Sequence, residues 1–358
     1  MRIPFTLFFG VFVVMALSNA IVPVLPAFAD ASSLQGAIYS AYFLGALIST
    51  LPGGILSDRF GRITVIKIGL AVTIVSGLLL SFTLAPGPVL AIRLAEGIGA
   101  GFFVAAGMSF VNSRADHGKM SGYYMALLNA GLVLGLVCSG WLAVAFHYPG
   151  SGVLAFTALA VLPLLVSFTL REPGTVQAPA PFDPGLLRSL VRDYRWLWLS
   201  SVILVGITGI VISLYPKFSG LPTDAVGVWI AGMSIATIVS VLLASRFTLP
   251  PVETIRWSAV LMAAGTLLSF YSPIGLVLLG AVAGIVMIAQ MAYLADIKGH
   301  QGIVMGLFST TSYLGMAILP VIAGFVADAG GFFLAFCVSA AFAVIIVVTI
   351  GRCSSCTR

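Results

Sequence analysis

The amino-acid sequence predicts an all-α integral membrane protein, with twelve transmembrane helices in two pseudo-symmetric six-helix bundles. Three observations predict this fold: the composition, the spacing of the apolar runs and a similarity between the two halves of the chain. Of the 358 residues, 60% are apolar and only 8% are charged, whereas soluble domains carry about 25% charged residues. A soluble protein of this length could not cover so much apolar surface with so few polar side chains.

Apolar runs of about the length that crosses a bilayer, roughly 20 residues, recur along the whole chain. The first run is longer than the roughly 7–15 apolar residues of a signal peptide, so we interpret it as a membrane helix. The connections are mostly short, as expected for helical hairpins, and no run shows the alternation of a transmembrane β-strand. The predicted spans are 3–29, 34–56, 63–84, 88–111, 120–146, 151–170, 196–216, 225–245, 256–272, 274–294, 301–327 and 330–350.

The basic residues predict the orientation of these spans. The chain has 17 lysines and arginines, and all except Arg93 and Lys217 fall on the side that holds the termini, the even-numbered loops and the middle linker. Cytoplasmic loops carry the excess of Lys and Arg in membrane proteins. We therefore expect a multi-pass protein of the plasma membrane with both termini in the cytoplasm. Because the charges form no basic face, the net charge of +6 does not indicate a nucleic-acid partner.

A polar segment divides the chain into two halves that resemble each other. We predict an N-terminal bundle at 1–170, a cytoplasmic linker at 171–195 and a C-terminal bundle with a short tail at 196–358. An offset of 180 residues aligns 116–160 with 296–340 without a gap, and matches Asp116 with Asp296. Parallel repeats of this kind typify transporters rather than receptors or membrane enzymes.

The loop after the second span carries a motif, Gly-Ile-Leu-Ser-Asp-Arg-Phe-Gly-Arg at 54–62. It resembles the signature G-x-L-x-D-R-x-G-R of the major facilitator superfamily, which occupies the same loop, and the resemblance in architecture covers the whole chain. We expect the glycines to permit a tight turn and close approach, and the charges to pair with helix ends or facing charges during gating. The alternative is a solvated charged turn that only sets orientation. The gating residues are Gly54, Asp58, Arg59, Gly61 and Arg62.

Arg93 and Glu96 are charges placed within the fourth span. Three residues apart, they share a helix face and can pair, and their distance from the end of the span predicts a partly buried pair. The segment from Arg93 to Gly99 resembles the family's motif R-x-x-Q-G-x-G, with Glu96 in place of glutamine, and that arginine is associated with proton coupling in the family's exchangers. Arg93 and Glu96 are therefore ion-coupling candidates, and a purely structural pair is the alternative. Asp30, at the end of the first span, is either a further coupling candidate or an exposed cap.

The fifth span carries a weakened form of another family motif. Its Gly131-x3-Gly135-Leu136 sequence looks like the exchanger motif G-x3-G-P-x2-G-G, with Leu136 in place of proline and Ser139 in place of a glycine. This resemblance favours the drug-exporter branch weakly, and close helix packing explains the same glycines.

Several polar side chains fall inside other spans and are candidates for a substrate cavity. Each can instead bond a neighbouring helix. A path otherwise lined by apolar and aromatic side chains suits an amphipathic organic compound. The candidates are Asn19, Tyr39, Tyr42, Asn129, Gln290 and Tyr313.

Together these features predict a secondary active transporter of a small organic solute that works by alternating access, with proton-coupled export as the leading version. A symporter or facilitator for a small metabolite is the alternative, and a membrane enzyme or solute sensor is a remote one. The chain contains no phosphate-binding G-x4-G-K-[ST] loop. We expect no enzymatic activity, cofactor or metal, and a monomer whose partners are its substrate, protons and the lipid bilayer.

Overall fold

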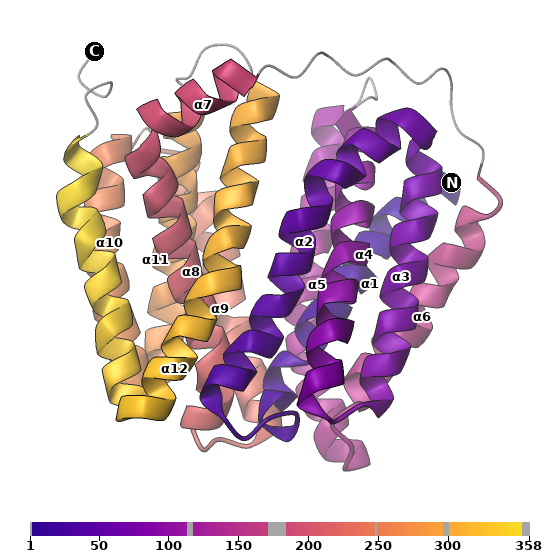
Figure 1. The fold of residues 1–358 in the computed structure, drawn as a ribbon, viewed down its shortest axis with the longest axis horizontal. Coiled ribbons are helices and arrows are strands. Elements are labelled where there is room, and N and C mark those ends of the chain that lie inside the picture. The colour runs from indigo at the N-terminus through magenta and orange to yellow at the C-terminus, as the bar shows by residue number, and fades with distance from the viewer. Residues whose placement is uncertain (1, 113–116, 171–183, 248, 296–300, 353–358) are drawn as a thin grey trace. The chain divides into compact units, whose positions relative to one another are not determined.

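The computed structural model describes residues 2–112, 117–170, 184–247, 249–295 and 301–352. These residues form twelve α-helices and two short 3-10 helices, with no β-strand among them (Figure 1). The α-helices are α1 (Arg2–Ala20), α2 (Ser32–Phe60), α3 (Arg62–Phe82), α4 (Pro86–Asn112), α5 (His117–Phe146), α6 (Ser151–Ser167), α7 (Pro184–Asp193), α8 (Arg195–Phe218), α9 (Thr223–Ala244), α10 (Pro251–Tyr271), α11 (Ile274–Ala295) and α12 (Gln301–Thr349).

The helices follow the predicted spans closely, and the differences have local causes. Residues 22–27 continue α1 as a 3-10 helix that contains Pro23 and Pro26. Helix α10 begins at Pro251, about five residues before its predicted start, because proline is favoured in the first turn of a helix. The predicted linker contains a helix that was not predicted, the ten-residue α7.

Nine stretches of the described residues are long and apolar enough to cross a membrane. One of them lies in α12, a 49-residue helix that includes predicted span 301–327 and all but the last residue of predicted span 330–350. Non-helical backbone at Gly331, with φ of 83°, kinks α12 at the start of the second of these spans. Helix α6 is shorter, with 17 residues, and α10 falls outside the nine. The all-helical membrane fold predicted from the sequence is confirmed.

Contacts group the chain into two compact units. Unit 1 comprises residues 1–30, 41–180 and 220–231, and unit 2 comprises residues 31–40, 181–219 and 232–358. Helix α2 therefore passes from unit 2 into unit 1 after Ser40, and α9 passes from unit 1 into unit 2 after Ala231. This grouping places two segments differently from a division by chain order alone.

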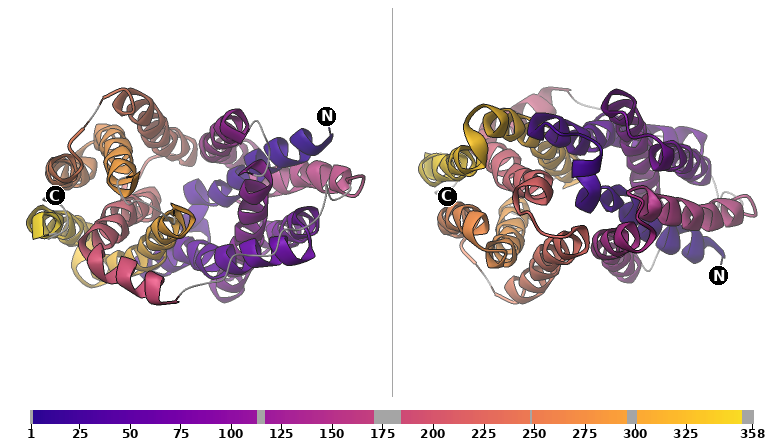
Figure 2. Two further views of the ribbon diagram at one scale, coloured as in Figure 1. Left: turned by 90° about the horizontal axis from the view of Figure 1, so that it is seen from above. Right: turned by 90° about the horizontal axis from the view of Figure 1, so that it is seen from below.

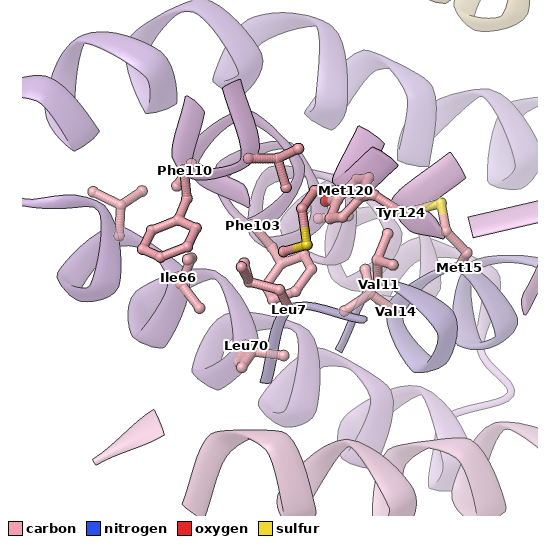
Figure 3. Close-up of a cluster of buried hydrophobic side chains, with 14 of the residues drawn as sticks. Leu7, Val11, Val14, Met15, Ile66, Leu70, Phe103, Phe110, Met120 and Tyr124 are labelled. Atoms are coloured by element: carbon pink, nitrogen blue, oxygen red, sulfur yellow. The ribbon is translucent and has the colours of Figure 1, made fainter. Parts of the chain in front are cut away.

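Unit 1 is held together by an apolar core among α1, α3, α4 and α5. Helix α1 packs against α5 and α6, and α3 packs against α4. Phe103 and Tyr124 lie at the centre of the core and are fully buried, with Leu7 and Leu70 around them (Figure 3). Because lipid is as apolar as these side chains, close packing rather than exclusion from water holds such helices together.

Unit 2 is built around α8 and the two parts of α12 on either side of Gly331. Helix α10 packs on α11 and α12, as the end-on views show (Figure 2). Its core contains Ile210, Leu214 and Leu319. Next to it, the ring of Phe218 stacks on that of Phe270 with centroids 4.6 Å apart, and lies 5.4 Å from the ring of Phe336. The aromatic cluster joins the end of α8 to α10 and α12.

Candidate functional site

The fourth predicted span, α4, places an ion pair inside unit 1. Arg93 Nη1 lies 2.7 Å from Glu96 Oε2, and both side chains are only 1% exposed. The i,i+3 spacing puts the two groups on one face of α4, as the sequence predicts. The prediction that the pair would be only partly buried is wrong, because residues of α1 and α2 cover it.

Two contacts from neighbouring helices complete the surroundings of Arg93. Its Nη2 donates a hydrogen bond of 3.2 Å to the backbone carbonyl oxygen of Ser18 in α1. Its guanidinium lies 4.8 Å from the centre of the Tyr42 ring in α2, within the range of a cation–π interaction. Gly97 allows α4 and α2 to approach each other this closely, since a Cβ atom at Gly97 would overlap the carbonyl oxygen of Tyr42. Arg93 therefore joins three helices of unit 1.

The ion pair keeps unused hydrogen-bonding capacity. Within the part of the chain that the structure describes, Glu96 Oε1 and Arg93 Nε are buried without a hydrogen-bond partner. Taking two charges out of water is costly, and a half-satisfied buried polar network offsets that cost poorly. Buried ionisable groups within membrane spans commonly mark ion or substrate pathways. The arrangement is chemically able to accept a proton on Glu96 while Arg93 keeps its two other contacts.

The predicted gating motif forms the end of α2, a one-residue turn and the start of α3. Gly61 makes the turn with φ of 93° and ψ of 141°, a backbone conformation that favours glycine. Arg62 Nε donates a hydrogen bond of 3.1 Å to Ser109 Oγ in α4, and the Arg59 guanidinium lies over the Phe60 ring. Beyond its own stretch of α2, no described atom lies within 4 Å of a Cβ placed at Gly54, so the structure shows no close approach at this glycine.

The candidate cavity residues are divided between the two units, with Asn19, Tyr42 and Asn129 in unit 1 and Tyr39, Gln290 and Tyr313 in unit 2. In unit 1, Asn19 Nδ2 donates to the Leu132 carbonyl oxygen at 3.3 Å, while Asn129 bonds its own helix at the Met125 carbonyl oxygen. In unit 2, the buried Gln290 Nε2 of α11 donates to Ser200 Oγ of α8 at 3.0 Å. These contacts fit the alternative of bonding between or within helices as well as they fit a cavity.

The aromatic candidates divide in the same way. Tyr42 belongs to the Arg93 site of unit 1. Tyr39 belongs to unit 2, where its hydroxyl lies 3.7 Å from the Met316 sulfur. Tyr313 is half-buried in α12.

The remaining expectations concern Asp30, metals and residues that the structure does not describe. Asp30 is exposed between the 3-10 helix and α2. Among the described residues, no three His, Cys, Asp or Glu side chains are grouped as metal ligands. The side chain of Asp58, the matched pair Asp116 and Asp296, and linker residues 171–183 lie outside the described part of the chain.

The partners of the buried polar groups could not be recognised in the sequence. Ser18 contributes a backbone carbonyl oxygen to Arg93, and Ser200 contributes a hydroxyl to Gln290. A backbone carbonyl leaves no signal in the residue type, and a serine inside an apolar span is common. The pattern in one helix cannot identify which residue of another helix faces it.

Comparison with known proteins agrees with this architecture. The family model described as Major Facilitator Superfamily matches residues 7–275. Multidrug resistance protein 2 of Bacillus subtilis (strain 168) is 23% identical over 350 residues, which cover 89% of this chain and 87% of that protein. Quinolone resistance protein NorA of Staphylococcus aureus (strain MSSA476) is 26% identical over 358 residues, which cover 90% of this chain and 89% of that protein.

Solved structures of similar fold include a variant of the nucleoside transporter NupG, with a TM-score of 0.80 and 14% identity over 99% of this chain and 100% of that one. A bacterial homolog of the human lysosomal transporter Spinster has a TM-score of 0.78 and 14% identity over 99% of this chain and 96% of that one. At such identities the likeness concerns the fold alone. The family model, by contrast, matches most of the sequence, and it agrees with the motifs at residues 54–62 and 93–99. The chain therefore belongs to the Major Facilitator Superfamily.

Proposed function

We propose that this membrane transporter exports amphipathic organic compounds in exchange for protons. The observation that carries the proposal is the buried pair of Arg93 and Glu96, covered by Ser18 and Tyr42. A buried carboxylate with one unpartnered oxygen can take up and release a proton, and its charge then changes the interactions among α1, α2 and α4. Coupling requires this link between a proton and the packing of helices.

The substrate class is supported by relatives that align along most of the chain. The two named above are described by resistance to multiple drugs and to quinolones. Quinolones are amphipathic and aromatic, which suits spans rich in phenylalanine and tyrosine. We propose quinolone-like compounds as the first substrates to test.

The remaining parts of the proposal rest on the sequence. Both termini lie in the cytoplasm, one chain forms a complete transport path, and the motif at residues 54–62 acts in gating. In that role Arg62 would exchange its contact with Ser109 for another partner as the transporter changes state. The substrate path would include the polar candidates Asn19, Tyr39, Tyr42, Asn129, Gln290 and Tyr313. Asp30 would be a second titrating group at the entrance.

The test uses purified protein in liposomes that contain a pH-sensitive dye. An imposed proton gradient drives uptake of a fluorescent quinolone, and proton flux and quinolone uptake are recorded together. We expect the wild type to move protons only when quinolone is present. Glu96→Gln should bind quinolone but move no protons with it. Glu253→Gln is the matched control, because it makes the same chemical change at an exposed carboxyl in the first turn of α10 and should leave coupling unchanged.

Other outcomes would identify a different mode of transport or a different coupling residue. Quinolone uptake without proton flux in the wild type would identify a facilitator and return Arg93 and Glu96 to a structural role. Proton and quinolone movement in the same direction would identify a symporter. Equal losses in Glu96→Gln and Glu253→Gln would contradict the assignment of coupling to Glu96.

A further inference from the structure

The beginning of α2 is capped by a residue far away in the sequence. The backbone N–H groups of Ser32 and Ser33 each donate a hydrogen bond of 2.8 Å to Asp328, one to Oδ1 and the other to Oδ2. Lys217 Nζ donates a further hydrogen bond of 3.1 Å to Ser32 Oγ. We call this arrangement the Asp328 cap. It lies entirely within unit 2.

The cap replaces one that the local sequence lacks. The first N–H groups of a helix have no partner within the helix, and a side chain at the preceding residue usually accepts a bond from one of them. In α2 that preceding residue is Ala31, which has no acceptor. A carboxylate at a helix N-terminus also interacts favourably with the helix dipole. Asp328 therefore provides both the acceptors and the charge that α2 lacks.

The cap lies at one end of a longer contact between residues 31–40 and α12. Gly36 allows the two backbones to touch, since a Cβ atom there would overlap the carbonyl oxygen of Pro320. Further along, Ser40 Oγ donates a hydrogen bond of 3.1 Å to the Met316 carbonyl oxygen. The contact covers about 18 Å of α12, at 1.5 Å per residue from residue 316 to residue 328.

Two features distinguish the cap from a permanent structural contact. Asp328 is exposed, as is its bond to Ser33, so water can replace the broken bonds and no charge is left buried when they open. In addition, α2 belongs to unit 2 only up to Ser40 and to unit 1 from Ala41. Any movement of one unit against the other must therefore act on residues 31–40.

We propose that the Asp328 cap is a releasable lock that sets how often residues 31–40 separate from α12. With the cap formed, α2 is fully capped and its first residues stay on α12. With the cap broken, Ser32 and Ser33 lose their acceptors and the segment is free to follow unit 1. The lock depends on neither proton coupling nor the identity of the substrate.

The test measures the opening of this contact with a buried cysteine. The four native cysteines are replaced by serine, and Ser40→Cys is introduced as the reporter, since Ser40 is 3% exposed in the contact. The purified protein is placed in nanodiscs, where both faces are accessible, and the rate of reaction with a membrane-impermeant maleimide is recorded. We expect Asp328→Ala to raise this rate about three- to tenfold, the size that fits the loss of charged hydrogen bonds at an exposed site. Asp328→Asn and Lys217→Met should give smaller increases.

Two controls separate the lock from general loosening of the fold. Ser269→Cys reports from α10, where Ser269 is 1% exposed and bonds its own helix, and its rate should not change with Asp328→Ala. Asp224→Asn removes a carboxylate from the first turn of α9 and should leave the Ser40→Cys rate unchanged. An unchanged Ser40→Cys rate in Asp328→Ala would overturn the proposal. So would a parallel rise of both reporters. If Asp328→Ala does not fold, the same comparison is made with Asp328→Asn.

Discussion

Each unit contains a buried polar contact that joins two of its helices. The two contacts differ in charge. In unit 1, Arg93 and Glu96 of α4 form an ion pair, and Arg93 reaches Ser18 of α1. In unit 2, Gln290 of α11 donates to Ser200 of α8. Both Glu96 and Gln290 are 1% exposed and keep one oxygen without a partner among the described residues. A neutral amide makes its contact at small cost, whereas an ion pair in the same surroundings requires both charges to be matched.

The difference indicates what each contact contributes. A contact that only joins helices does not need charge, as Gln290 and Ser200 demonstrate. The ion pair of unit 1 carries the additional free-energy cost of removing two charges from water, which is not needed to pack helices closely. This cost makes the ion pair, rather than its neutral counterpart, the candidate for a titrating site.

The largest effect is expected when one charge of the pair is removed. Arg93→Leu leaves Glu96 buried without a counter-charge, which typically lowers the free energy of unfolding by about 3–5 kcal/mol. Thermal unfolding of the purified protein in detergent should show a correspondingly lower midpoint. Arg188→Leu is the control, because Arg188 is exposed in α7 and its loss should cost less than about 0.5 kcal/mol. Equal midpoints for the two variants would contradict the claim that the buried charge of Glu96 must be matched by Arg93.

A second effect is expected when both charges are removed together. Arg93→Leu combined with Glu96→Leu leaves no uncompensated charge, so the double variant should be more stable than Arg93→Leu alone. Neighbours of this kind couple by about 0.5–3 kcal/mol in double-mutant cycles. The same double variant should show no substrate-dependent proton flux in liposomes. A stable double variant that still moves protons together with the substrate would place the titrating group elsewhere.

A smaller effect is expected at the neutral contact of unit 2. Gln290→Leu removes one hydrogen bond, while Ser200 keeps its bond to the Leu197 carbonyl oxygen at 2.7 Å. The free energy of unfolding should fall by about 0.5–1.5 kcal/mol, measured by the same thermal method. A loss as large as that of Arg93→Leu would show that charge is not what distinguishes the two contacts.

The smallest effect on stability is expected at a polar group that bonds only its own helix. Asn129 Nδ2 donates to the Met125 carbonyl oxygen at 2.8 Å, a partner that α5 itself provides. Asn129→Leu should therefore change the free energy of unfolding by less than about 0.5 kcal/mol. If Asn129 lines the substrate path, quinolone affinity should nevertheless change, which a binding titration of the purified variant measures. Unchanged affinity would remove Asn129 from the substrate path.

Much of the fold could be predicted because hydropathy is a local property. A run such as 274–294 is apolar whatever lies beside it, and α11 spans Ile274–Ala295. Turn chemistry is equally local, so Gly61 could be recognised as the turn between α2 and α3. Helix α7 was missed because it lies in a linker that the sequence analysis treated as one polar segment.

Less of the candidate site could be predicted, because contacts between helices depend on residues distant in sequence. The spacing of Arg93 and Glu96 predicts their pairing, but not their complete burial beneath Tyr42 and Ser18. The polar candidates could be identified by type, yet only the structure distinguishes Asn129, which bonds its own helix, from Gln290, which bonds another.

The sequence by itself determined that this chain is a membrane protein with an ion pair on α4, because composition and i,i+3 spacing act within one segment. Only the tertiary structure decided which groups meet that pair, and that α2 is capped by Asp328, 296 residues from Ser32. The physical reason is that a helix satisfies its interior backbone by itself, but its ends and its buried side chains must find partners on other helices. Those partners are selected by the packing of the whole chain.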